Sequence, residues 1–212
     1  MNSPLLPLGK SRGERADAVR NREHLLDVAR QMVAEHGVDN VTMDGLAARA
    51  GLGKGTVFRR FGTRAGIFRA LMDADELLFQ HEVMRGPPPL GPGAAPVPRL
   101  VAYGRARIAF LYGHFEVARA TIDRNGPVPA EGVEFTRMHI RMLLALARLD
   151  ISDLDNLAVQ LTTALEGPIL LAMYMPEPPG TADPKGLLAD SWQTLTERVC
   201  RPWLGSHEGL LS

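Results

Sequence analysis

Apolar residues recur three and four positions apart along most of the chain, which is the spacing of amphipathic helices. The first such stretch starts at Asn21 and ends at Gly37, and a longer one runs from Arg64 toward Met84. After a proline-rich break at residues 86–98, four or five more helical stretches follow without a convincing strand. The pattern therefore predicts an all-α protein of about nine or ten helices.

Two very short helical stretches meet at a tight turn between residues 42 and 61. Thr42 can cap the first helix, and Gly51 ends it because so sharp a reversal favours a residue that tolerates positive φ. Apolar contacts for the second helix come from Leu52, Val57, Phe58 and Phe61. This arrangement predicts a helix-turn-helix, whose second helix can enter a DNA major groove, about 12 Å wide.

The same segment resembles the TetR family of transcriptional repressors. The family pattern is roughly Thr, then apolar-Ala-x-x-Ala-Gly-apolar-x-x-Gly-Thr-apolar-Tyr-x-His-Phe-x-Ser-Lys-x-x-Leu, and the resemblance covers about residues 20 to 70. It implies an N-terminal DNA-reading domain and a C-terminal helical domain that binds a small molecule and dimerises. The matching positions are Thr42, Leu46, Ala47, Ala50, Gly51, Leu52, Gly55, Thr56, Val57, Phe58, Arg60, Phe61, Thr63, Arg64 and Ile67.

Three positions differ from the family pattern in side-chain chemistry. Phe58 replaces a tyrosine and cannot donate a hydrogen bond to phosphate, whereas Arg60 replaces a histidine and adds a charge. Arg64 replaces a lysine and keeps a phosphate-binding cation. Taken singly, Val57, Phe58 and Phe61 are expected in the core rather than in contact with DNA, and Arg59 can simply be solvated. The predicted DNA-binding residues are Thr42, Gly53, Lys54, Gly55, Thr56, Phe58, Arg59, Arg60 and Arg64.

These patterns divide the chain into four parts. We expect a flexible N-terminal arm at residues 1–19, a helix-turn-helix domain at 20–66, a helical ligand-binding and dimerisation domain at 67–205, and a tail at 206–212. The helix that starts near Arg64 is long enough to leave the first domain and enter the second.

The two most regular apolar stripes lie near the C-terminus. The resemblance implies that these helices pack against their copies in a second subunit as a four-helix bundle, and the alternative is that the stripes complete the core of their own chain. Pro168 interrupts the first of the two helices. The predicted interface residues are Leu154, Leu157, Leu161, Leu165, Ile169, Leu188, Leu195 and Val199.

Bulky apolar residues with a few polar tips are candidates for a ligand pocket in the second domain. Each of them can equally be core. We expect no cofactor, and no metal because His114 and His139 lack a third ligand at suitable spacing. The hypothesis is that an apolar or amphipathic small molecule enters the helical core and changes the separation of the two recognition helices. The candidates are Tyr103, Phe110, Tyr112, His114, Phe115, Met138, His139, Met142, Tyr174 and Trp192.

The net charge is zero over the 212 residues, but it is unevenly distributed. Residues 1–70 carry 12 lysine and arginine residues against 7 aspartate and glutamate residues, and residues 71–212 carry 12 against 17. The basic half contains the helix-turn-helix, as expected if only that half faces phosphate. Only three of the 24 cationic residues are lysine, so the presence of arginine at a site is weak evidence for DNA binding. The positions of the arginines are better evidence.

The chain shows no apolar run of the roughly 18 to 20 residues that span a bilayer. The first nine residues have no basic start, which argues against a secretory signal and predicts a cytoplasmic protein with no membrane partner. The single Cys200 is expected to be a small packed residue, with redox sensing as the alternative.

Two other functions compete with ligand-responsive repression. No catalytic triad, paired acids, metal spacing or phosphate loop is present, so we expect no enzyme. A ligand-independent architectural DNA-binding protein is the stronger alternative, because the sequence does not establish a cavity. The sequence thus predicts a transcriptional regulator that binds a double-stranded DNA operator as a homodimer.

Overall fold

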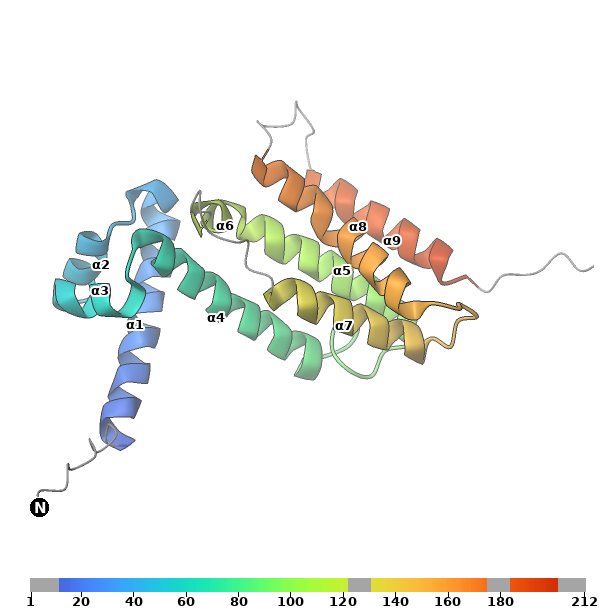
Figure 1. Ribbon diagram of the computed structural model, residues 1–212, viewed down its shortest axis with the longest axis horizontal. Coiled ribbons are helices and arrows are strands. Elements are labelled where there is room, and N and C mark those ends of the chain that lie inside the picture. The colour runs from blue at the N-terminus through green and yellow to red at the C-terminus, as the bar shows by residue number, and fades with distance from the viewer. Residues whose placement is uncertain (1–11, 122–130, 175–183, 202–212) are drawn as a thin grey trace, which may run out of the picture. The chain divides into compact units, whose positions relative to one another are not determined.

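The computed structural model describes residues 12–121, 131–174 and 184–201, and within them every regular element is helical (Figure 1). This confirms the predicted all-α class. The elements are α1 (Arg12–His36), the 3-10 turn η1 (Val38–Asn40), α2 (Met43–Arg49), α3 (Lys54–Phe61), α4 (Arg64–Arg85), α5 (Pro96–Gly113), α6 (Phe115–Thr121), α7 (Glu131–Leu146), α8 (Leu154–Tyr174) and α9 (Pro184–Val199).

The chain forms two compact units, which are described separately below. Among the described residues, unit 1 holds 12–74 and 116–121, and unit 2 holds 75–115, 131–174 and 184–201. The division falls between Ala74 and Asp75, inside α4, eight residues after the domain boundary expected from the sequence. A helix that carries a domain boundary gives no glycine or proline signal there, which explains the difference.

Unit 1 is built around one apolar core to which α1, α2, α3, α4 and α6 all contribute. Leu25 of α1, Leu46 of α2 and Val57 of α3 are all fully shielded from solvent. Ile67 and Phe68 close the core from the first turns of α4. The short helices α2 and α3 are therefore held by tertiary packing, since helices of seven and eight residues are marginal alone.

The first helix begins earlier than the sequence analysis expected. α1 starts at Arg12, so residues 12–19, assigned to a flexible arm, are helical. After Gly13 the segment contains no glycine or proline before Gly37, and its alanine, arginine and glutamate residues favour a helix. Residues 1–11 lie outside the described part of the chain.

In unit 2, α5 packs against α7, α8 and α9 (Figure 1). The shared core includes Leu100 and Tyr103 of α5, Leu144 of α7, Leu165 of α8 and Trp192 of α9. The approach of α5 to α9 depends on Gly104, because a Cβ there would overlap the Trp192 indole. The indole Nε1–H of Trp192 donates to the carbonyl of Leu100 at 3.2 Å, which fixes the ring against α5.

The proline-rich connection is shorter than the predicted loop of residues 86–98. α5 begins at Pro96, and Pro98 lies in its first turn. Proline is tolerated there because the first backbone N–H groups of a helix have no intrahelical acceptor. Pro168 lies inside α8, in the helix where the sequence placed it.

Candidate nucleic-acid interface

The turn between α2 and α3 has the local geometry that the sequence predicted. The Oγ1 atom of Thr42 accepts a hydrogen bond from the Gly45 N–H at 3.0 Å and so caps α2. Gly51 has a φ of +65°, and the Leu52 N–H donates to the Ala47 carbonyl at 3.0 Å across the reversal. The predicted cap and turn are thus confirmed, and together they set the angle at which α3 leaves α2.

The helix α3 has one buried face and one exposed face. Val57 and Phe61 are buried in the core of unit 1, whereas Lys54, Arg59 and Arg60 are exposed. Phe58 is 64% exposed, so it is not the core residue that its chemistry suggested. Since α3 contains no acidic residue, its exposed face is cationic with one aromatic ring.

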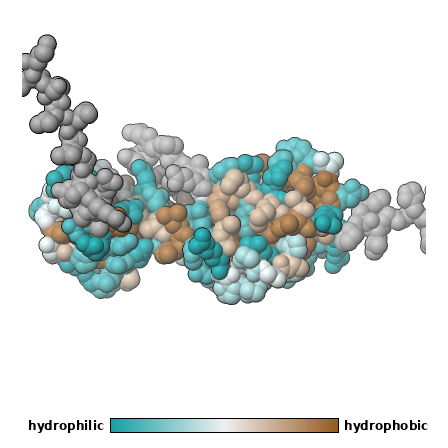
Figure 2. All heavy atoms as spheres, turned by 90° about the horizontal axis from the view of Figure 1, so that it is seen from below, coloured by the Kyte–Doolittle hydropathy of each residue, from teal (hydrophilic) through white to brown (hydrophobic). Residues whose placement is uncertain are grey.

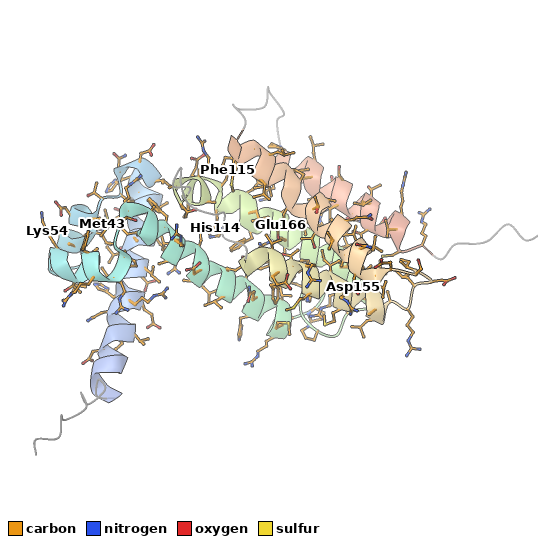
Figure 3. All side chains as sticks on the ribbon, in the orientation of Figure 1. Met43, Lys54, His114, Phe115, Asp155 and Glu166 are labelled. Atoms are coloured by element: carbon orange, nitrogen blue, oxygen red, sulfur yellow. The ribbon has the colours of Figure 1, made fainter. Side chains whose placement is uncertain are left out.

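The cations of α3 are held by contacts that solvent can reach. Lys54 projects from the start of α3 (Figure 3), and its Nζ lies 2.7 Å from Oδ2 of Asp44 on α2. The Nε–H of Arg59 donates to the Gly55 carbonyl of the same helix at 3.2 Å. Exposed pairs of this kind contribute little to stability, so an external anion can compete for both cations.

Two predicted DNA-binding glycines flank Lys54. An added Cβ at Gly53 or Gly55 would meet no described atom within 4 Å. Gly53 has a φ of −65°, which any residue can adopt. Packing within unit 1 therefore does not require glycine at either position. A remaining explanation for the two glycines is that another molecule approaches the backbone closely there.

Arg64, the first residue of α4, turns toward its own domain. Its Nε–H donates to the Val41 carbonyl at 2.8 Å and its Nη2 donates to the Val38 carbonyl at 2.6 Å. The guanidinium also lies 5.0 Å from the centroid of the Phe68 ring. The phosphate contact expected of Arg64 stays a prediction, and the structure gives this side chain a second role that the sequence analysis did not consider.

Unit 2 buries a polar network that the sequence analysis missed. The Arg107 Nε–H donates to Oε1 of Glu166 at 3.1 Å, and its Nη1 lies 2.5 Å from Oε2 of Glu76. The Tyr103 hydroxyl donates to Oγ1 of Thr136 at 2.9 Å, and that Oγ1 lies 2.7 Å from Oε1 of Glu166. Burial raises the pKa of Tyr103 above its ordinary value, so the phenol stays protonated. The available signal was a charged residue in the apolar C-terminal half of a helix, as at Glu166 of α8 (Figure 3).

The ten predicted pocket residues differ in how far they are exposed. Tyr103, His139 and Trp192 are buried in the core of unit 2, Met138 is 53% exposed, and the side chain of Tyr174 lies outside the described residues. The remaining five are half-buried, and they are Phe110, Tyr112, His114, Phe115 and Met142. Their role as a ligand pocket stays a prediction.

His114 and His139 have different surroundings. The ring of His114 is hydrogen-bonded to the Phe110 carbonyl at 2.8 Å and to Asp75 at 3.0 Å. His139 is only 4% exposed and its Nε2 has no hydrogen-bond partner among the described residues. Burial, with a smaller contribution from Arg99, lowers the pKa of His139 to about 4. His139 is therefore neutral near pH 7, and its free ring nitrogen is a polar atom to which a ligand can bond.

A groove of about 600 Å³ lies on the outer face of α7. Two predicted pocket residues line it, Met138 and Met142, and it is open to solvent. Its charged residues are partnered, since Nε of Arg141 lies 2.5 Å from Oδ1 of Asp155. The other lining residues are Arg137, Ala145 and Leu146.

The predicted dimer residues fall into two groups. Leu161, Leu165 and Ile169 are each at most 2% exposed, so they serve the interior of their own unit, which the sequence analysis kept open as the alternative. Leu154, Leu157 and Leu188 are half-buried against that core, Val199 is half-buried, and Leu195 is 37% exposed. The apolar residues that α8 and α9 expose are mainly others: Val159, Leu171 and Leu187. Hydrophobic side chains reach the surface of unit 2 on the face drawn in Figure 2.

Cys200 is buried, and burial raises the pKa of its thiol. A raised pKa leaves less of the reactive thiolate, which favours the packing role over redox sensing. Among the described residues, no three histidine, cysteine, aspartate or glutamate side chains come together as a metal site requires. None of the described helices has the length and apolar character needed to cross a membrane.

Comparison with known proteins agrees with the helix-turn-helix geometry of unit 1. Residues 25–71 match the family described as bacterial regulatory proteins, tetR family. An HTH-type transcriptional regulator of Staphylococcus aureus strain bovine RF122 is 34% identical over 53 residues, which are 25% of this chain and 29% of that relative. A second, from strain USA300, is 31% identical over 65 residues, 31% of this chain and 35% of that relative. The chain thus matches about a third of the length of these curated relatives.

Solved structures extend the likeness in fold to most of the chain. A TetR-family transcriptional regulator from Pectobacterium atrosepticum has a TM-score of 0.65 at 16% identity, covering 90% of this chain and 95% of that one. SmeT, the repressor of a multidrug efflux pump of Stenotrophomonas maltophilia, has a TM-score of 0.58 at 24% identity, covering 84% and 89%. A SmeT complex with triclosan has a TM-score of 0.55 at 25% identity, covering 85% and 91%. The matched residues 25–71 and the shared all-helical fold together support a TetR-family transcriptional regulator.

Proposed function

We propose that this protein binds a specific double-stranded DNA operator as a homodimer, with α3 as the recognition helix. The observation that carries the proposal is the two-sided character of α3: Val57 and Phe61 lock it into the core, while Lys54, Phe58 and Arg59 are exposed. A helix held in this way can place its N-terminal residues against base edges. The net charge of +5 over residues 1–70 supports phosphate contact by the same unit.

Dimerisation is proposed because one recognition helix contacts few base pairs. A single recognition helix contacts only a few base pairs, so useful specificity requires two half-sites. The exposed apolar residues Val159, Leu171 and Leu187 support a contact between copies of α8 and α9. A two-fold dimer would place two identical heads on a palindromic site.

We further propose that the regulator is a repressor that an apolar or amphipathic small molecule releases from its operator. Support comes from the triclosan complex of SmeT and from the free Nε2 of His139 within the core of unit 2. Release requires only that the ligand prefers the shape that does not bind DNA. A hundredfold preference corresponds to about 2.7 kcal/mol, which lies within usual coupling energies.

The DNA proposal is tested by selecting binders from random duplex DNA with the full chain and measuring their affinity in gel shifts. We expect a pseudo-palindromic site with half-sites about one helical turn apart. Thr56→Ala and Lys54→Ala should change which bases are preferred. Equal binding of selected and random duplexes would contradict the proposal and favour the architectural alternative.

The ligand proposal is tested by adding triclosan and a panel of apolar and amphipathic compounds to the purified protein–operator complex. At least one compound should weaken the complex, and His139→Phe should reduce the response to a compound that bonds to the free ring nitrogen. A complex that stays equally tight across the whole panel would argue against release by a ligand of this class.

A further inference from the structure

We propose that Arg64 is a positioning residue that holds the entry to the helix-turn-helix, and that it is not a phosphate contact. The proposal rests on the proposed function, because positioning matters only if α2 and α3 read DNA. It concerns the residue at which the sequence pattern most directly suggested a phosphate-binding cation.

The guanidinium of Arg64 joins two points of the segment that precedes α2. Its Nε–H donates to the Val41 carbonyl at 2.8 Å, and its Nη2 donates to the Val38 carbonyl at 2.6 Å. Val38 begins the turn η1, and Val41 is the residue directly before the cap Thr42. One side chain of α4 thus fixes both ends of the turn that leads into α2.

The Val41 carbonyl depends on a donor of this kind, whereas the Val38 carbonyl also accepts the Val41 N–H at 3.2 Å. Val41 is fully buried, and it lies directly before Thr42, the N-cap residue of α2. A shielded carbonyl that loses its donor has a substantial desolvation cost. If Arg64 turned outward to a phosphate, the bonds to both carbonyls would break at the moment when the head must be well ordered.

Other contacts hold the guanidinium in this orientation. It lies 5.0 Å from the centroid of the fully buried Phe68 ring, one turn further along α4. Its Nη2 also lies 3.7 Å from Oδ1 of Asp39 in η1. A cation–π contact and a nearby carboxylate both favour the inward position over an extended one.

The chemistry requires arginine and not merely a positive charge. The guanidinium is a planar fork whose Nε and Nη2 donors point in fixed directions, so it can bond to two carbonyls at once. A lysine ammonium is a single point at the end of a flexible stem and cannot reproduce both bonds in the same geometry. Phosphate binding as a point charge, in contrast, would tolerate lysine.

This difference gives a direct experiment on the full chain with Arg64→Lys, Arg64→Ala and the control Arg69→Lys. Arg69 is exposed on the same helix and has no assigned contact with DNA. Hydrogen exchange of the free protein is followed over the peptide that contains Val41 to Leu46, and operator affinity is measured at several salt concentrations.

We expect Arg64→Lys and Arg64→Ala to exchange this peptide faster and to bind the operator about tenfold more weakly. The slope of log affinity against log salt should match the wild type in both variants, because no phosphate contact is lost. Arg69→Lys should match the wild type in all measurements.

Arg64→Lys binding like the wild type, with a slope reduced by about 0.9 in Arg64→Ala, would identify a phosphate contact and overturn the proposal. Wild-type exchange rates in either variant would overturn it as well. If the wild type binds no DNA specifically, the proposed function fails by itself, and the exchange data still decide whether Arg64 orders the entry to α2.

Discussion

The two units of this protein place their charged side chains in opposite ways. Among the described residues of unit 1 no charged side chain is buried, whereas unit 2 buries Arg99, Arg107 and Glu166. Unit 1 keeps its charges at the surface, as in the Lys54–Asp44 pair, where an external partner can reach them. Unit 2 uses its buried charges to connect α4, α5 and α8 through Glu76, Arg107 and Glu166.

The difference separates two uses of charge. An exposed ion pair contributes at most about 1 kcal/mol, so its residues can exchange partners at little cost. A buried pair is costly to break because the remaining charge has no solvent. The exposed charges of unit 1 are therefore suited to binding another molecule. The buried charges of unit 2 are suited to stabilising one arrangement of its helices.

The largest expected effect comes from breaking the buried network with Glu166→Ala. Arg107, which is only 3% exposed, would keep a single carboxylate partner, and we expect a loss of about 3 to 5 kcal/mol in the free energy of unfolding. Denaturant titration measures the loss, and Glu166→Gln separates the charge from the volume. The control is Glu134→Ala in the exposed pair with Arg137 of the same unit, and equal effects of the two alanine variants would refute the contrast between buried and exposed charge.

A second prediction concerns the pH dependence of unit 2. Burial lowers the pKa of His139 to about 4 from its ordinary 6.5, so between these values the unfolded chain binds a proton that the folded chain excludes. Stability contributed by the neutral ring is complete above pH 6.5 and is lost as the pH falls toward 4, by up to about 3 kcal/mol. His139→Phe should flatten this part of the stability curve, and an unchanged slope in the variant would show that other groups cause it.

A smaller loss is expected from Gly104→Ala in α5. The new methyl group would overlap the Trp192 indole, and overpacking of this kind costs about 1 to 3 kcal/mol. Thermal unfolding gives the change. Gly113→Ala in the same helix is the control, because a Cβ there would meet no described atom within 4 Å. A larger loss at Gly113 than at Gly104 would exclude close helix approach as the cause.

The smallest effect on stability is expected in unit 1, from Lys54→Ala. The Lys54 side chain is 74% exposed, so we expect a change below about 1 kcal/mol in unfolding free energy. The base preference found by duplex selection should nevertheless change. Strong destabilisation with an unaltered base preference would reverse the roles that we assign to exposed and buried charge.

The sequence predicted unit 1 better than unit 2, because the features of unit 1 depend on residues close together in the sequence. The cap at Thr42, the positive φ at Gly51 and the start of α4 depend on neighbouring residues, so the sequence shows them directly. Arg107 and Glu166 are 59 residues apart, and their pairing depends on how α5 packs against α8. Local patterns do not contain that information.

Two further differences have the same origin. The periodicity of α8 showed that Leu161 and Leu165 lie on a buried face, but not whether their own chain or a second copy buries it. The pattern placed a cation at Arg64, but the direction of its side chain follows from the tertiary position of Val38 and Val41. Periodicity thus identifies faces, and only packing identifies partners.

The open space around Gly53 and Gly55 makes the start of α3 adaptable. Because an added Cβ at either position would meet no described atom within 4 Å, a duplicated gene could acquire alanine there and leave the packing of unit 1 unchanged. Under the proposed function, an added side chain would occupy the space in which DNA can approach the backbone, so related regulators could diverge in their target promoters through one or two codons. A library randomised at these two codons, selected against altered operators, should yield folded retargeted variants, and a library yielding only unfolded protein would disprove this route of divergence.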